Sequence, residues 1–169
     1  MTYTELPEVT ITPEDTLFAN VETVKGNFRL KLRPDLALVN VNSFVFLARD
    51  GYYDGVTFHR VLPGFVAQGG DPTGTGSGGP GYNVPDEFSD GDFKRGVVAM
   101  ANTGAPNSAG SQFFVVYDDA PHLKGLLTIF AEVVEGMDVV DSLTPRDPQA
   151  LASGSPPGDQ IITITIDEG

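Results

Sequence analysis

The sequence predicts a mainly β fold, a closed antiparallel β-barrel of eight strands capped by two α-helices. Glycine and proline are plentiful, at 20 and 13 of 169 residues, which favours turns and short strands over long helices. About eight short runs are rich in β-branched and aromatic residues, and two stretches carry a helical period. The last run, residues 160–167, is a strong strand that can close the sheet and remove its edges.

One domain is expected, because 169 residues with 40% hydrophobic side chains suffice for a single core. Residues 1–15 contain two prolines and several acidic side chains without a clear period. They predict a loosely attached N-terminal arm, and residues 16–169 form the folded domain.

The first two strands are expected at residues 16–24 and 26–32, joined by a tight turn at Lys25 and Gly26. In the second strand every other residue is apolar, from Phe28 to Leu32. This alternation is typical of a half-buried strand.

A helix follows, because apolar residues recur at a spacing of three and four positions. Its apolar face consists of Val41, Phe44, Val45 and Ala48. Asn40 is a candidate N-cap, and Gly51 is well placed to end the helix in a left-handed conformation.

The central stretch, residues 58–71, reads FHRVLPGFVAQGGD and predicts a β-hairpin. Pro63-Gly64 is a strong turn signal, and the flanking segments 56–61 and 65–69 are rich in strand formers. The hairpin would place Arg60 beside the second of these strands.

A glycine-rich segment follows at residues 69–81, where seven of 13 residues are glycine. A phosphate-binding loop would need a lysine at its end or a helix directly after it. The next basic residue is Lys94, and the segment is followed by YNVP. A tightly turned surface loop is therefore the better interpretation.

Three more strands are expected at residues 96–100, 112–117 and 128–133, and a second short helix at 136–143. The segments between them, and residues 144–158, are small, polar or proline-rich and predict loops. In the closing strand, isoleucines 162, 164 and 166 alternate with threonines 163 and 165.

Ten basic and 23 acidic residues give a net charge of −13, which disfavours nucleic acid and anionic membranes as partners.

The chain has no cysteine, so disulfides, thiolate metal ligands and thiol nucleophiles are excluded. Two separated histidines with no third ligand argue against a metal site, and no cofactor is predicted. With no run of 18 apolar residues and no signal-peptide pattern at the start, we expect a cytoplasmic location. With no helix suited to association, we expect a monomer.

Arg60 is the most informative single residue of the hairpin. A cation that keeps its proton at any working pH, next to aromatic residues, suits binding and polarising an amide rather than abstracting a proton. The alternative at this point is a rim arginine that only packs its stem on the barrel surface.

A second stretch, residues 100–114, reads MANTGAPNSAGSQFF. Together with residues 58–71 it resembles the cyclophilin-type peptidyl-prolyl cis–trans isomerases, over roughly residues 17–166. The resemblance implies a bacterial-type single domain with the cyclophilin-like barrel and a substrate groove on its outer face. It also implies isomerisation of X–Pro bonds in proline-containing peptides and in unfolded or partly folded proteins.

The resemblance implies catalytic roles for Arg60, Phe65 and Gln68. It implies substrate contacts for a further set of residues: Val66, Ala101, Asn102, Gln112, Phe114, His122, Leu123 and Leu127. His59 is expected to point to the opposite face of its strand, because side chains alternate, and to be structural.

Three positions depart from the family pattern. Ala105 is a one-residue insertion that predicts a bulge in the loop between Asn102 and Gln112. His122 stands where many eukaryotic members carry Trp, so weakened cyclosporin binding is implied. Leu127 aligns with a family histidine and cannot donate a hydrogen bond.

Two alternatives to the isomerase stay open at this point. One is a module that binds proline segments with weak or no turnover, which Leu127 favours and the intact Arg60, Phe65, Gln68 and Phe114 oppose. The other is a barrel that carries a small apolar ligand in its interior.

Overall fold

The computed structural model describes residues 2–151 and 155–169. The strands are β1 (Leu17–Thr23), β2 (Gly26–Leu32), β3 (Thr57–Phe58), β4 (Arg60–Leu62), β5 (Val66–Gly69), β6 (Val97–Met100), β7 (Phe113–Val116), β8 (Ile129–Glu135) and β9 (Asp159–Glu168). The helices are α1 (Leu38–Arg49) and α2 (Met137–Asp141), and one 3-10 turn is η1 (Pro121–Leu123).

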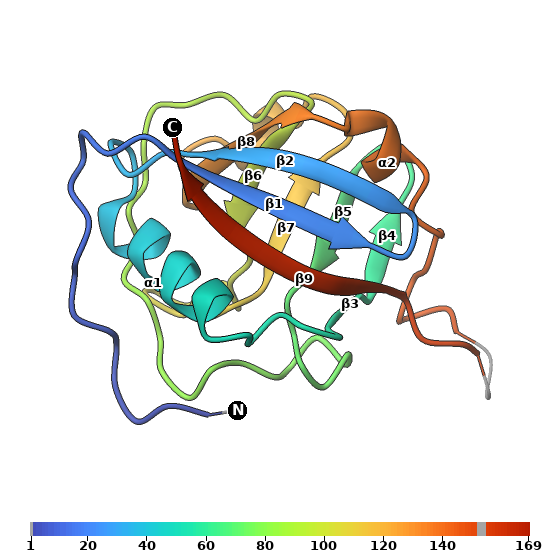
Figure 1. The fold of residues 1–169 in the computed structure, drawn as a ribbon. Helices are drawn as coiled ribbons and strands as arrows, with labels where there is room; N and C mark the ends of the chain where they lie inside the picture. Colours follow the sequence, from blue (N-terminus) through green and yellow to red (C-terminus); the bar gives the residue numbers. More distant parts are fainter. Residues whose placement is uncertain (1, 152–154) are drawn as a thin grey trace.

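The nine strands form one antiparallel sheet in the order β3-β9-β1-β2-β8-β6-β7-β5-β4. The sheet curls into a nearly closed barrel, with α1 and α2 on opposite sides of it (Figure 1). An isolated antiparallel bridge between Thr57 of β3 and Asp71, just after β5, brings the two ends of the sheet together. The predicted mainly β barrel with two helices is confirmed.

The described residues contain nine strands instead of the expected eight, because His59 interrupts the run 56–61, which the sequence predicts as one strand. β3 pairs with β9, whereas β4 pairs with β5. The hairpin itself is confirmed: Arg60 lies opposite Gln68, and Gly64 has a φ of +78° in the turn.

The closing strand contains a β-bulge. Glu22 of β1 pairs with Thr163, but the next residue, Thr23, pairs with Ile161. Ile162 is left over and is 56% exposed, whereas Ile161 and Ile164 are buried. Ile162 thus lies outside the regular alternation of this strand, because a bulge shifts the alternation by one residue.

Aromatic side chains fill the interior of the barrel. Phe44 of α1 packs against Phe113 and Phe130, with ring centroids 5.8 and 5.2 Å apart, and Phe58 packs edge-on against Phe113 at 6.0 Å. All four rings are at most 1% exposed. A filled interior leaves the alternative of an internal apolar ligand without support.

The start of α1 is capped by a side chain from elsewhere in the chain. The helix begins at Leu38, so Asn40 lies in the first turn and is not the N-cap. The Glu87 carboxylate accepts hydrogen bonds from the backbone N–H groups of Val39 (3.2 Å) and Asn40 (2.7 Å). Sequence spacing cannot reveal a cap that is supplied 47 residues away. The end is as predicted, since Gly51 has a φ of +76°.

We expect Glu87→Ala to lower the free energy of unfolding by about 1–2 kcal/mol, which is typical for the loss of a helix N-cap. The two backbone donors and the Asn40 amide, 2.6 Å from the same carboxylate, would lose their acceptor. Urea denaturation of Glu87→Ala and of Asp90→Ala, a carboxylate with no ion pair among the described residues, would measure the difference. Equal stability of the two variants would contradict the capping role.

The N-terminal arm runs along α1 (Figure 1). Thr10 N–H donates to Asn42 Oδ1 at 3.0 Å, and Asn42 Nδ2 donates to the carbonyl of Glu8 at 3.0 Å. Ile11 is buried against the core. The arm is thus attached more closely than its lack of periodicity predicted, because one helix side chain bonds its backbone twice.

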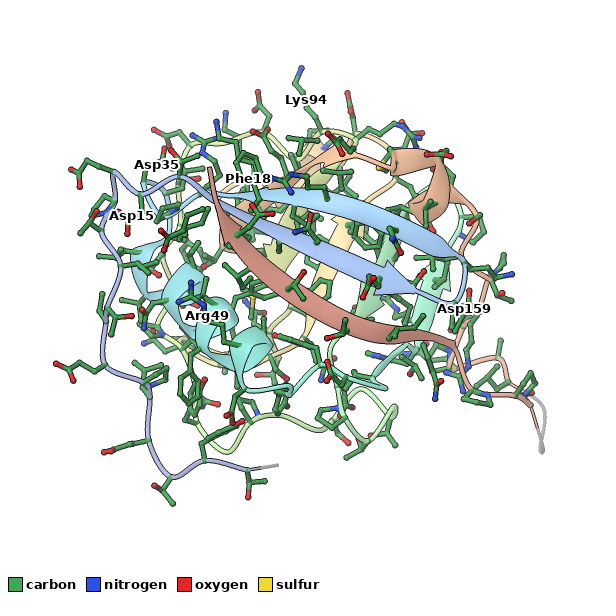
Figure 2. All side chains as sticks on the ribbon, viewed as in Figure 1. Asp15, Phe18, Asp35, Arg49, Lys94 and Asp159 are labelled. Atoms are coloured by element: carbon green, nitrogen blue, oxygen red, sulfur yellow. The ribbon has the colours of Figure 1, made fainter. Side chains whose placement is uncertain are left out.

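Charged side chains lie on the outside of the barrel, as Figure 2 shows for Asp15, Asp35, Arg49, Lys94 and Asp159. The ion pairs of the described residues are surface pairs, and the shortest joins Arg95 and Asp141 at 2.6 Å. No helix in the described residues is long and apolar enough to cross a membrane.

Candidate active site

Outward-facing residues of β5 and β7 form a second apolar cluster on the outside of the barrel. Val66 and Phe114 belong to this cluster, whereas their neighbours Ala67, Phe113 and Val115 belong to the interior core. A surface pocket of about 490 Å³ opens above it. The outer face of the sheet, and not its interior, therefore provides the binding site.

The structure brings most of the predicted site residues together. Nine of the eleven line this pocket: Arg60, Phe65, Val66, Gln68, Ala101, Asn102, Phe114, Leu123 and Leu127. The other two adjoin it. Gln112 is hydrogen-bonded to Gln68, and the His122 ring stacks on Phe65 with centroids 5.9 Å apart and planes at 26°.

Five further residues line the pocket that the sequence did not indicate as site residues: His59, Thr75, Gly76, Pro148 and Gln149. Pro148 and Gln149 reach it because Arg146 pairs its backbone with Val61 of β4. This pairing adds residues of a predicted loop to the edge of the sheet. Loop composition carries no signal for such a pairing.

His59 is buried, at 1% exposure, and it lines the pocket. The expected orientation toward the opposite face is wrong, because His59 lies between β3 and β4 and outside the ladder that enforces alternation. The pKa of His59 is lowered, mainly by burial. The Asp71 carboxylate opposes this decrease, whereas the positive charges of Arg146 and Arg60 add to it. At neutral pH the imidazole is therefore uncharged. His59 thus adds no second positive charge next to Arg60.

Arg60 is held by a chain of side-chain hydrogen bonds. Its Nη1 donates to Gln68 Oε1 at 3.2 Å, and Gln68 Nε2 donates to Gln112 Oε1 at 3.0 Å. Gln112 Nε2 in turn donates to the carbonyls of Gly76 (2.9 Å) and Gly78 (3.1 Å). The position of the guanidinium thus depends on the glycine-rich loop.

The glycine-rich loop is organised around the buried carboxylate of Asp71. Oδ1 accepts from the N–H of Thr73 at 2.8 Å, and Oδ2 accepts from the N–H groups of Gly76 (2.7 Å) and Gly78 (3.0 Å). Burial alone would raise the pKa of Asp71, but these bonds lower it overall. A Cβ on Gly78 would lie 2.0 Å from Oδ1, so only glycine fits there. The N–H groups of this loop are used to bind the loop's own Asp71 carboxylate, and its carbonyls face Gln112. A phosphate site would need free N–H groups, so this is a structural loop, as expected.

The loop from Asn102 to Gln112 contains Ala105 in an exposed turn. Ser108 closes this turn: its hydroxyl accepts from Thr103 N–H at 3.0 Å and donates to the Ala105 carbonyl at 2.8 Å. Ala101 stays at the pocket because its N–H donates to the Gln112 carbonyl at 2.9 Å.

A second pocket of about 690 Å³ adjoins the first. The two share Gln68, Gly76, Ala101 and Asn102. The second is lined further by residues of the glycine-rich loop, by Ser111 and Gln112, and by Thr2 of the arm. The four shared residues join the two pockets into one groove.

Histidine, aspartate and glutamate side chains of residues 2–151 and 155–169 form no group of three that could hold a metal ion.

The sequence matches known proteins over most of its length. A sequence model of the family described as cyclophilin type peptidyl-prolyl cis-trans isomerase/CLD matches residues 18–165. A peptidyl-prolyl cis-trans isomerase of Synechococcus elongatus is 47% identical over 131 residues, which are 76% of this chain and 90% of that protein. Peptidyl-prolyl cis-trans isomerase B of Bacillus subtilis is 44% identical over 125 residues, 72% of this chain and 87% of that protein.

The fold matches as well. A crystal structure of a Cryptosporidium parvum cyclophilin type peptidyl-prolyl cis-trans isomerase superposes with a TM-score of 0.80 and 30% sequence identity, covering 91% of this chain and 99% of the other. The family match, over residues 18–165, spans the strands that line the groove. The chain therefore belongs to the cyclophilin-type peptidyl-prolyl cis-trans isomerase family and is an enzyme that rotates X–Pro peptide bonds.

Proposed function

We propose that Arg60 accelerates the rotation by binding the twisted X–Pro amide more tightly than the planar one. The observation that supports this role is the placement of Arg60 in one pocket with Phe65 and Phe114. The guanidinium is also fixed by Gln68, so that it need not be ordered when the substrate binds.

The reaction needs no nucleophile, because no covalent bond is made or broken. Its barrier of about 18–20 kcal/mol arises because rotation disrupts amide resonance. In the twisted state the proline nitrogen regains its lone pair, which can then accept a hydrogen bond from Arg60. The planar amide offers almost no such lone pair, so the interaction stabilises the transition state selectively.

The apolar residues hold the proline ring while the rest of the bond rotates. Phe65, Val66, Phe114 and Leu123 line the pocket, and their contacts are non-directional, so they bind both isomers. The Gln68 amide and the backbone at Asn102 fix the peptide on either side of the ring. Rotation of one end against a clamped end lowers the entropic part of the barrier.

These contributions are large enough for the reaction. Shortening an exchange of tens of seconds to milliseconds requires roughly 10⁴-fold, or about 5–6 kcal/mol. A hydrogen bond from a charged donor supplies about 1.5–3 kcal/mol, and orientation in a partly buried pocket can supply the rest. No proton transfer from His59 or His122 is required.

The mechanism also does without a polar side chain at position 127. We expect Leu127→His to leave kcat/KM for a prolyl peptide unchanged or to raise it, because the histidine would add a hydrogen-bond donor to the rim of the pocket. A protease-coupled peptide assay measures this, with Leu126→His, a change at the 61% exposed neighbour, as the control. A marked fall for Leu127→His alone would mean that the apolar side chain itself takes part in binding.

The same assay on the wild-type protein tests the overall proposal. Turnover of X–Pro peptides far above the uncatalysed rate is expected. Tight peptide binding without acceleration would instead favour the proline-binding module.

Proline-containing peptides are the substrate class of the family, and a crystal structure of the Cryptosporidium relative was determined in the presence of the dipeptide Ala-Pro. For this enzyme we propose unfolded or partly folded proteins as the larger substrates. We also propose weakened cyclosporin binding, because the exposed His122 stacks on Phe65 in place of the tryptophan of many eukaryotic members. A cytoplasmic location and a monomeric state stay predictions of the sequence.

A further inference from the structure

The beginning of the N-terminal arm reaches the second pocket of the groove. Thr2 lines that pocket together with the glycine-rich loop. The next residue, Tyr3, donates its backbone N–H to the Pro80 carbonyl of this loop at 2.7 Å. A segment that has no sequence signal for function therefore contacts the substrate groove.

The arm and the loop pack closely at this point. A Cβ on Gly81 would lie 2.4 Å from the Tyr3 carbonyl oxygen, so the two backbones are in contact. Tyr3 is also held from the other side, because its hydroxyl donates to Asp50 Oδ2 at the end of α1 at 2.6 Å. The arm therefore links the loop to a helix of the core.

The Tyr3 ring belongs to an aromatic cluster that it forms with Phe46, Tyr52 and Tyr82, at centroid distances of 5.3, 6.2 and 6.3 Å. Two of these aromatic partners lie at the second pocket. Tyr82 lines the pocket directly. The Tyr52 hydroxyl is hydrogen-bonded at 2.9 Å to the hydroxyl of Ser111, and Ser111 also lines the pocket.

We propose that the first residues of the arm are part of the substrate site. Thr2 forms a wall of the second pocket, and Tyr3 is a positioning residue that holds the glycine-rich loop and Tyr82 in place. Together they set the affinity for the residues of a substrate that flank the X–Pro bond. This inference rests on the proposed function, since it requires the peptide to extend from the first pocket into the second.

The first test compares binding of a long and a short ligand to Tyr3→Ala. The probes are an Ala-Pro dipeptide and a hexapeptide with Ala-Pro at its centre. We expect the Kd of the hexapeptide to rise about three- to tenfold, because a loop that is ordered in the wild type would have to be ordered on binding. The Kd of the dipeptide should be unchanged, since it occupies only the first pocket.

Steady-state kinetics on the hexapeptide add a second readout. KM should rise by the same factor as Kd, with kcat within about twofold of wild type. Tyr3 contacts the loop at Pro80 and Gly81, whereas Asp71 anchors the Gly76–Gly78 part of the loop, whose carbonyls hold Gln112 and, through Gln68, Arg60. A fall in kcat together with weaker dipeptide binding would overturn the inference and indicate general disruption of the site.

Matched variants complete the test. Val9→Ala, at a 41% exposed arm residue that lines neither pocket of the groove, should bind both ligands as wild type does. Deletion of residues 2–8 should reproduce the effect of Tyr3→Ala, and thermal denaturation would verify that both variants are folded. If hexapeptide binding is unchanged in both, the arm has no role in the site. Arg60→Ala, measured in parallel, would show whether the proposed mechanism itself has failed.

Discussion

Replacing Arg60 with alanine is expected to lower kcat/KM for X–Pro isomerisation by at least about tenfold, while the Kd for the same peptide changes less. The charged hydrogen bond to the proline nitrogen forms only in the twisted amide, and its loss of about 1.5–3 kcal/mol corresponds to roughly 10- to 150-fold in rate. The apolar contacts of Phe65 and Phe114, which bind the planar substrate, stay intact in the variant.

Two further variants sharpen this experiment. Arg60→Lys keeps the charge but loses the planar fork that can bond Gln68 and the substrate together, so an intermediate activity is expected. Arg49→Ala removes a half-exposed cation whose nearest carboxylate oxygen is 3.9 Å away, and it should have wild-type activity. A parallel loss of affinity and rate in Arg60→Ala would contradict selective binding of the transition state.

The second large effect is expected for Asp71→Asn. The carboxylate accepts from four backbone N–H groups, those of residues 73, 75, 76 and 78, and an amide replaces one acceptor oxygen by a donor that would face them. Leaving buried donors without a partner costs about 1–3 kcal/mol each, so we expect the unfolding free energy to fall by at least about 2 kcal/mol. Activity should fall too, because the carbonyls of Gly76 and Gly78 hold Gln112 and, through Gln68, Arg60.

The stability of Asp71→Asn should also depend on pH differently from that of the wild type. The pKa of Asp71 is lowered in the folded protein, so its contribution to stability is fully present above the unfolded value of about 3.9. This contribution is lost as the pH falls through the folded pKa. Between pH 6 and pH 3, urea denaturation should therefore show a smaller loss of stability for Asp71→Asn than for wild type. Asp54→Asn, at an exposed position, serves as the control, and identical acid profiles for all three proteins would contradict the assignment.

The sequence predicted what depends on local signals. The Pro63-Gly64 turn and the two flanking apolar runs determine the hairpin and its register, and the register alone places Arg60 opposite Gln68. Alternation within β5 and β7 likewise separates Val66 and Phe114 from the interior core. A site built from strand residues is therefore largely visible in the sequence.

The features that were missed depend on contacts between distant segments or on irregular backbone. Glu87 caps a helix 47 positions away, and Arg146 pairs with Val61 although its segment has the composition of a loop. The orientation of His59 and the exposure of Ile162 were missed because each interrupts a regular ladder, one between two strands and one at a bulge. No period in the sequence marks such an interruption.

In β5 and β7, one face of each strand packs in the core and the other faces the groove. This separation affects how the substrate specificity of the enzyme can change during evolution. Ala67, Phe113 and Val115 anchor the strands in the core, whereas Val66 and Phe114 on the same strands face the substrate. Mutations on the second set can retune which peptides are accepted while the first set continues to secure the scaffold. New specificities can thus accumulate by drift on one side of a strand without first requiring compensating changes on the other.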